Sequence, residues 1–212
     1  MKIDLRNLSF EPKNKSVFTG LNYCFESGIK YLIQGASGCG KSSLLRFISS
    51  LDDASSGEIL INDHKIDDYC EYRKNCQWLS QTPHIYNLSV KENLEMALNY
   101  HQMDPPNTED LTCLIKQLFP EGLDLDTNAM ALSGGQKHRL ALLRAILLQP
   151  QALLCDEISA GLDELSRKLS EEFIFRYCEK MTVIFVSHIK ESFAGKMNIT
   201  TLNMTSKELR EI

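Results

Sequence analysis

Residues 35–42 read Gly-Ala-Ser-Gly-Cys-Gly-Lys-Ser, a glycine-rich segment whose residue types suit a phosphate chain. Glycines let the backbone fold so that successive N–H groups point inward at phosphate oxygens. Lys41 would bring a positive charge to the β- and γ-phosphates, and the Ser42 hydroxyl would be a ligand for Mg²⁺. The segment fits the pattern GxxxxGK[ST], which about one chain in a hundred of this length would match by chance. The predicted contacts with the nucleotide are Gly35, Ala36, Ser37, Gly38, Cys39, Gly40, Lys41, Ser42 and Ser43.

An apolar strand that ends in two carboxylates supplies the second predicted part of this site. Ala152–Cys155 is followed directly by Asp156 and Glu157. A carboxylate at the end of a strand is a suitable partner for the Mg²⁺ that accompanies a nucleotide, and we assign this role to Asp156. Glu157 can accept a proton from the attacking water as a general base. Without Lys41 upstream, a solvated acidic strand end would be the default interpretation.

Leu132–Gln136, with the sequence LSGGQ, is a second segment suited to an anion. Ser133 is a preferred helix N-cap, and the two glycines after it expose backbone N–H groups at the positive end of a helix. Only a few chains in roughly ten thousand of this length would contain this pentapeptide by chance. One chain therefore carries two phosphate-binding segments, and the predicted contacts of the second are Ser133, Gly134, Gly135 and Gln136.

The two segments and the carboxylates that follow them closely resemble the ATPase domain of ABC (ATP-binding cassette) proteins. The resemblance covers almost the whole chain, and the motifs occur in the expected order. They are Walker A (residues 35–42), the glutamine of the Q-loop (Gln81), the signature (residues 132–136), Walker B with its catalytic glutamate (residues 153–157), the D-loop (Ser159–Asp163) and the switch histidine (His188).

The resemblance implies a mechanism in which two copies act together. In this family two ATPase subunits form a head-to-tail sandwich, so each ATP would lie between Lys41 of one copy and Ser133–Gln136 of the other. Gln81 would sense Mg²⁺ and link to the transport partner, and His188 would contact the γ-phosphate. The metal ligands implied are Ser42, Gln81 and Asp156, and the catalytic residues are Glu157, His188, Lys41 and Gln81.

Two positions depart from the family pattern. The family usually places an aromatic residue well before Walker A, where it stacks on adenine, but here that position falls on Pro12. Phe10 or Phe18 could take this role, or both could belong to the core, so selectivity between adenine and guanine stays open. The D-loop is usually SALD, which makes Gly161 an extra residue. Asp163 remains a candidate for contact across the dimer.

The spacing of apolar residues places these motifs on alternating strands and helices. Ser89 with Glu92 should form a capping box at the start of a helix, and Asn62-Asp63 should form a hairpin turn. We expect strands over residues 2–8, 21–25, 30–34, 58–61, 152–155 and 182–186, and helices over residues 41–51, 90–100, 109–119, 133–148 and 163–180.

The predicted fold class is α/β: a P-loop NTPase with a mostly parallel core sheet, an N-terminal antiparallel β subdomain and an inserted helical subdomain. We expect a single ABC ATPase domain over residues 1–212. Its core and β subdomain would comprise residues 1–81 and 149–212, and its helical subdomain, which carries the signature, residues 82–148.

Composition narrows the class of protein. The chain has 212 residues, is 43% hydrophobic and 24% charged, and is therefore ordinary for a globular protein. A net charge of -5 argues against binding to nucleic acid. No apolar run approaches the roughly 18 residues of a membrane span, and no secretory signal is visible. Seven cysteines without CxxC spacing fit neither a disulfide framework nor a zinc site, so we expect a cytoplasmic protein.

We therefore expect an ATPase subunit that docks on a separately encoded membrane permease, peripheral on the inner face of the membrane. The docking groove would include Ile85 and Tyr86, although local packing of these side chains is an equal alternative. The chain looks most like short stand-alone bacterial ATPases, for example the iron-export or metal-resistance type. Three alternatives are a soluble ABC ATPase serving metal-cluster assembly or another complex, a P-loop kinase or GTPase, and a non-hydrolysing regulator.

Overall fold

The computed structural model describes residues 1–14, 16–158, 162–187 and 199–212. Contacts among the residues cluster into two units, and we describe each unit by itself. Unit 1 comprises Met1–Trp78, Gln151–Glu157 and Lys180–Ile212, and unit 2 comprises Leu79–Pro150 and Ile158–Glu179.

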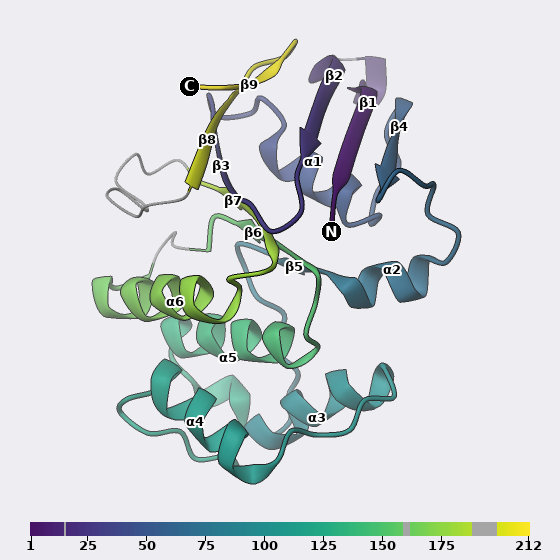
Figure 1. Cartoon of the computed structure of the whole chain (residues 1–212). Helices are drawn as coiled ribbons and strands as arrows, with labels where there is room; N and C mark the ends of the chain where they lie inside the picture. Colours follow the sequence, from purple (N-terminus) through teal and green to yellow (C-terminus); the bar gives the residue numbers. More distant parts are fainter. Residues whose placement is uncertain (15, 159–161, 188–198) are drawn as a thin grey trace. The chain divides into compact units, whose positions relative to one another are not determined.

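Unit 1 contains an antiparallel sheet with the strand order β2-β1-β4 (Figure 1). Its strands are β1 (Ile3–Phe10), β2 (Phe18–Phe25) and β4 (Ser56–Ile61). The register of β1 shifts after Leu5, around Asn7, whose φ is +49°. Such a bulge changes which side chains face the core, and Leu8 is accordingly as buried as Leu5.

A two-residue turn follows β4, as predicted. Asn62 and Asp63 have φ values of +50° and +69°, a pair of left-handed residues typical of tight hairpin turns. The N–H groups of Ile61 and His64 each donate to the other's carbonyl, at 2.8 and 3.0 Å. The turn closes a single bridge between these two residues.

A second sheet has the strand order β5-β6-β7-β3-β8-β9. Its strands are β3 (Lys30–Gln34), β5 (Cys76–Leu79), β6 (Ala152–Asp156), β7 (Thr182–Val186), β8 (Ile199–Met204) and β9 (Leu209–Glu211). β6, β7, β3 and β8 run parallel, and β9 pairs antiparallel with β8. Every residue of β6 and β7 is buried, as expected for strands covered on both faces. The predicted α/β class with a mostly parallel core sheet and an N-terminal antiparallel sheet is confirmed.

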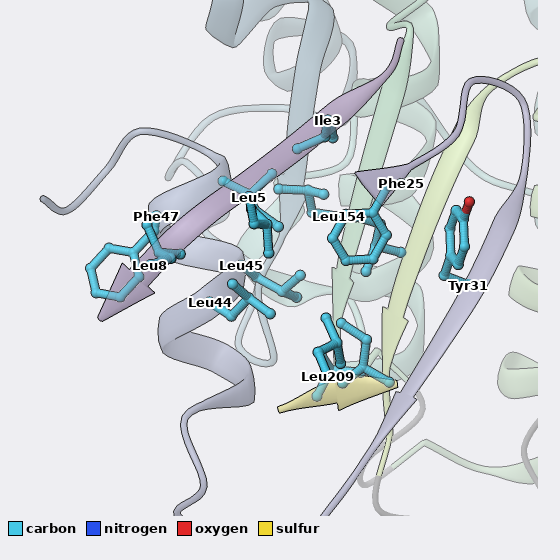
Figure 2. Packing of buried hydrophobic residues seen from close by; sticks show 14 of the residues in the cluster. Ile3, Leu5, Leu8, Phe25, Tyr31, Leu44, Leu45, Phe47, Leu154 and Leu209 are labelled. Atoms are coloured by element: carbon cyan, nitrogen blue, oxygen red, sulfur yellow. The ribbon is translucent and has the colours of Figure 1, made fainter. Parts of the chain in front are cut away.

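The core of unit 1 is formed by residues of the antiparallel sheet, of α1 (Lys41–Ile48) and of the second sheet. Figure 2 shows Leu5 of β1 close to Leu44 and Leu45 of α1, and Phe25 of β2 close to Leu154 of β6. This packing anchors α1, and with it the glycine-rich loop that precedes the helix. The remaining helical segments of unit 1 are the short turn η1 (Pro12–Asn14) and α2 (Tyr69–Asn75).

Unit 2 is helical. Its helices are α3 (Val90–Tyr100), α4 (Thr108–Leu118), α5 (Gly134–Leu147) and α6 (Glu164–Tyr177), with the short turn η2 (Ala129–Ala131) before α5. The capping box predicted at Ser89 and Glu92 is present, and a second one joins Ser133 and Gln136 at the start of α5. Most of α5 beyond its first turn is buried, because α3, α4 and α6 all contact it.

α6 clusters with the helices of unit 2, although it follows the segment 82–148 that we expected to form the helical subdomain. Phe173 and Ile174 are buried on α6, and Arg176 donates a 2.8 Å hydrogen bond to Gln117 of α4. The sequence analysis did not predict α2, β8 or β9. α2 is mostly polar and has no apolar stripe, and β8 carries only two buried side chains, Leu202 and Met204.

Candidate functional site

The glycine-rich loop joins the end of β3 to the start of α1, where the backbone makes close approaches that exclude a side chain. At Gly40, φ is +101°, and a Cβ would lie 2.7 Å from the Phe18 ring and 2.9 Å from Val17. A Cβ at Gly35 would collide with the carbonyl oxygen of Met204. The loop therefore requires glycine at both positions, because the surrounding atoms are ring and backbone atoms that cannot move aside.

Lys41, the first residue of α1, places its ammonium group inside the loop. The side chain is buried, and Nζ donates to the carbonyl oxygens of Gly35 at 2.9 Å and Ala36 at 3.0 Å. Cys39 Sγ lies 3.9 Å from the same nitrogen. A buried cation held by loop carbonyls brings full positive charge into the glycine-rich loop, which suits a polyanion.

Ser42 and Asp156 meet across the sheet, as their predicted roles require. The Ser42 hydroxyl donates a 2.8 Å hydrogen bond to Asp156 Oδ1, and the two residues are 114 positions apart in sequence. Asp156 is the last residue of β6 and is buried. A hydroxyl oxygen beside a carboxylate oxygen is a donor set of hard ligands that fits Mg²⁺.

Glu157, directly after β6, has an unusual backbone. Its φ is +50°, which is uncommon for a residue other than glycine, asparagine or aspartate, and its N–H donates to the carbonyl of Val186 at 3.0 Å. The bond to β7 holds the chain in this conformation. A locally strained residue at the end of a buried strand, next to Asp156, is a position where function commonly maintains strain.

The signature segment of unit 2 forms the first turn of α5. Ser133 Oγ accepts the N–H of Gln136 at 3.2 Å, and Gln136 Oε1 accepts the N–H of Ser133 at 3.0 Å. The first turn of the helix carries no acidic side chain that would neutralise its positive end. The oxygen of the Gln136 amide is thus used to hold Ser133, which the sequence analysis did not foresee when it placed Gln136 among the nucleotide contacts.

Gly135 is packed against the start of α6. A Cβ there would lie less than 3.0 Å from Ser166 Oγ and 3.2 Å from Asp163 Oδ2, whereas a Cβ at Gly134 would meet nothing within 4 Å. Asp163 is the N-cap of α6: it accepts the Ser166 N–H at 2.9 Å and the Ser166 hydroxyl at 2.7 Å. The hydrogen bonds from Ser166 lower the pKa of Asp163. Asp163, which we considered for contact across a dimer, therefore caps α6 within its own chain.

The segment after Gln81 is held by two side chains of unit 2. Arg144 of α5 donates to the His84 carbonyl at 2.7 Å, and its guanidinium lies 5.4 Å from the centre of the Tyr86 ring. Asn93 of α3, fully buried, accepts the Tyr86 N–H at 3.0 Å and donates to the Tyr86 carbonyl at 3.1 Å. Tyr86 nevertheless remains 37% exposed, so local packing covers only part of its ring.

The predicted site residues fall into three groups. Unit 1 brings together Lys41, Ser42 and Asp156, with Glu157 next in sequence. Gln81, which is exposed, and residues 133–136 belong to unit 2. His188 and the D-loop residues 159–161 lie outside the described residues.

The two aromatic residues considered for adenine stacking belong to the core. Phe18 is fully buried, and its ring centre lies 6.1 Å from that of Phe47. Phe10 packs edge-on against the Phe47 ring at 4.9 Å. Pro12 lies in η1 and is partly exposed.

One ion pair next to the signature was missed by the sequence analysis. Arg139, whose side chain is 5% exposed, is bound to Glu121 at 2.7 Å. The sequence carried no clear signal for this burial, because Arg139 follows the polar residues Lys137 and His138. A buried cation needs a counter-ion. Its partner could not be identified from sequence, because Glu121 lies in a loop 18 residues away.

None of the helices in the described ranges is long and apolar enough to cross a bilayer. Among the residues that the structure describes, no three His, Cys, Asp or Glu side chains gather as a metal-binding group.

A glycine-rich loop between a parallel strand and a helix, a buried lysine inside it, and a serine bound to a strand-end aspartate define a P-loop nucleotide-binding protein. Comparison with known proteins is more specific. The family described as "ABC transporter" matches residues 18–160. The chain is 30% identical to the probable iron export ATP-binding protein FetA of Escherichia coli over 99% of this chain and 94% of FetA.

Other relatives show how far the match extends. The chain is 34% identical to the phosphate import ATP-binding protein PstB of Campylobacter jejuni, over 86% of this chain and 78% of PstB. It is 35% identical to the ABC-type transporter kk1G of Curvularia clavata, but spans only 15% of that longer protein. A bacterial Atm1-family ABC exporter solved with ATP bound has the same fold, with a TM-score of 0.85 over 99% of this chain and 38% of the exporter, at 23% identity.

The chain belongs to the ABC transporter family, and it is an ATP-binding ATPase of that family. The predicted family is thereby confirmed, and the alternative of a P-loop kinase or GTPase is excluded.

Proposed function

We propose that this chain is the ATP-hydrolysing subunit of a transporter and drives a separately encoded permease through ATP-dependent, head-to-tail dimerisation. The observation that carries the proposal is the contact between Ser42 and Asp156 beside the buried ammonium of Lys41. The match to FetA over nearly the whole length of both chains supports a stand-alone subunit, since FetA is described as an ATP-binding protein. Docking on a permease would place it on the inner face of the membrane.

In this proposal unit 1 binds the triphosphate. The loop N–H groups and the Lys41 ammonium bind the β- and γ-phosphates and stabilise the charge that develops on them during hydrolysis. Ser42 and Asp156 would hold Mg²⁺ with Gln81, and the ion would supply further positive charge to the phosphate oxygens. Glu157 accepts the proton of the attacking water, and His188 contacts the γ-phosphate.

Unit 2 completes the site of a second copy. The N-terminus of α5, whose first turn has no acidic residue of its own, is suited to bind the γ-phosphate of the ATP held by the facing subunit through Ser133 and the two glycine N–H groups. The segment at residues 84–86, held by Arg144 and Asn93, would meet the permease with the exposed part of Tyr86. A soluble ABC ATPase serving metal-cluster assembly stays as the alternative, and co-purification with a membrane protein or with a soluble one distinguishes them.

Two variants test the hydrolytic proposal. Lys41→Ala should nearly abolish ATP binding, because the variant loses the only loop side chain with a positive charge. Glu157→Gln should keep ATP binding, lose turnover and accumulate as a dimer, since only the proton acceptor is removed. Binding is measured with a fluorescent ATP analogue, turnover by phosphate release, and dimerisation by light scattering. A Glu157→Gln variant that hydrolyses ATP at the parent rate would show that Glu157 is not the base.

A further inference from the structure

The side chain of Gln136, the last residue of the signature, is held by Glu121, which lies outside the signature. Its Oε1 accepts the Ser133 N–H, and its Nε2 donates to Glu121 Oε1 at 3.2 Å. An amide has one oxygen and one nitrogen, so fixing the nitrogen at Glu121 leaves the oxygen turned to Ser133. Glu121 thereby selects the orientation of the side chain that positions the N-cap of α5.

Glu121 also carries the ion pair to Arg139, one turn further along the helix. Arg139 Nη2 lies 2.7 Å from Glu121 Oε1, and Nη1 lies 3.2 Å from Oε2, an arrangement with two parallel hydrogen bonds. Nη1 also donates to the Leu118 carbonyl at 2.6 Å, and Nε donates to the Gly135 carbonyl at 3.4 Å. The guanidinium thus joins the backbone of the signature to the loop that contains Glu121.

The charge on Glu121 is needed for this arrangement. Partial burial raises the pKa of Glu121, but hydrogen bonds from Arg139 and Gln136 lower it by more than burial raises it. The net shift of the pKa is downward, and the carboxylate is ionised at neutral pH. Arg139 is 4% exposed and has no other acidic partner among the ion pairs of the described residues. A neutral side chain in place of Glu121 would leave a buried cation bound only by carbonyl oxygens.

We propose that Glu121 is a positioning residue for the ATPase reaction: through Gln136 and Arg139 it holds the turn at Ser133–Gln136 in the geometry that receives the γ-phosphate. The proposal rests on the proposed function of this turn in a facing subunit. The side chain of Glu121 is 39% exposed, so its replacement leaves no large cavity. Glu121 belongs to none of the motifs named above.

The first experiment measures ATP-driven dimerisation in the Glu157→Gln parent. Adding Glu121→Gln keeps the size of the side chain and removes its charge. We expect the ATP concentration for half-maximal dimerisation to rise about tenfold or more, the usual scale for losing a hydrogen bond to a charged group. The Kd of a fluorescent ATP analogue for the monomer should not change, because Walker A belongs to the other unit. This unchanged Kd shows that unit 1 of the variant is folded, and a helical circular dichroism spectrum equal to the parent's shows the same for unit 2.

The second experiment measures steady-state turnover without the Glu157 substitution. Glu121→Gln should lower kcat about tenfold with the same analogue Kd. Glu95→Gln is the matched control, because Glu95 forms an exposed ion pair with Lys91 at 3.8 Å on α3 of the same unit. It should change neither measurement. Glu121→Asp keeps the charge but has a shorter side chain that does not reach Gln136, so it should also lower kcat. If Glu121→Gln does not bind the analogue, the kcat of Glu121→Asp tests the positioning role instead.

The outcomes separate the proposed positioning role of Glu121 from the proposed ATP-dependent dimerisation. A Glu157→Gln parent that stays monomeric with ATP contradicts dimerisation, and turnover of Glu121→Gln then tests Glu121 by itself. If the folded Glu121 variants turn over ATP at the parent kcat, or the double variant dimerises at the parent's ATP concentration, Glu121 has no positioning role.

Discussion

The two glycines of the signature should respond oppositely to alanine, because only one of them is packed. A Cβ at Gly134 would meet nothing within 4 Å, but at Gly135 it would lie less than 3.0 Å from Ser166 Oγ and 3.0 Å from Ser166 Cβ. Ser166 is buried on the first turn of α6, and its hydroxyl is bound to Asp163. Neither atom can move aside without loosening the cap of α6.

The expected size of the effect follows from this geometry. Forcing one methyl group into a close-packed contact costs about 1–3 kcal/mol. In a chain of 212 residues, each 1 kcal/mol corresponds to about 2–4 °C in Tm. We therefore expect Gly135→Ala to lower the Tm by about 4–8 °C, taking about 2 kcal/mol as the central value. Gly134→Ala should leave the Tm unchanged or raise it slightly, since alanine favours the helix more than glycine does.

Thermal unfolding of four proteins measures this effect: the parent, Gly135→Ala, Ser166→Ala and the double variant. Ser166→Ala removes the oxygen that the new methyl group would meet, so the double variant should be more stable than the sum of the single effects by about 1 kcal/mol or more. Equal changes in Tm for the two glycine variants would refute the packing argument. So would strict additivity in the cycle with Ser166.

Three further outcomes follow from described contacts. Asn93→Leu should lower the free energy of unfolding by about 1–3 kcal/mol in urea denaturation, because the partly buried Tyr86 N–H loses its acceptor, whereas the Tyr86 carbonyl keeps the Leu88 N–H. Glu121→Gln should be less stable than the parent at pH 7, and the difference should shrink as the pH falls below 4.5. Because the folded-state pKa of Glu121 is lowered, the stability that its charge contributes is present above 4.5 and is lost as the pH falls through the folded-state pKa. Equal stability at pH 7 would contradict this. Alkylation of Cys39, whose Sγ lies 3.9 Å from Lys41 Nζ, should block binding of the fluorescent analogue, and ATP should protect the thiol. Cys39→Ala should bind the analogue after the same treatment, and full binding by the alkylated parent would be the contrary result.

Local features were predictable from sequence because their interactions span only a few residues. The capping box predicted at Ser89 joins residues three positions apart and is present, and Ser133 is the N-cap of α5 as predicted. The turn at Asn62-Asp63 likewise depends on the conformations of two residues. α2 and β8 were missed because each has too few buried side chains to establish a period: Tyr72 in α2, and Leu202 and Met204 in β8.

The sequence by itself identified the family and predicted the two phosphate-binding segments and the strand-end carboxylates, because these depend on residue types at short, fixed spacing. Only the tertiary structure showed that Ser42 meets Asp156, that Gly135 packs against Ser166, and that Phe18 belongs to the core. Each of these contacts joins segments far apart in the chain. Their distance is set by how sheets and helices pack to bury apolar surface, and no local pattern records it.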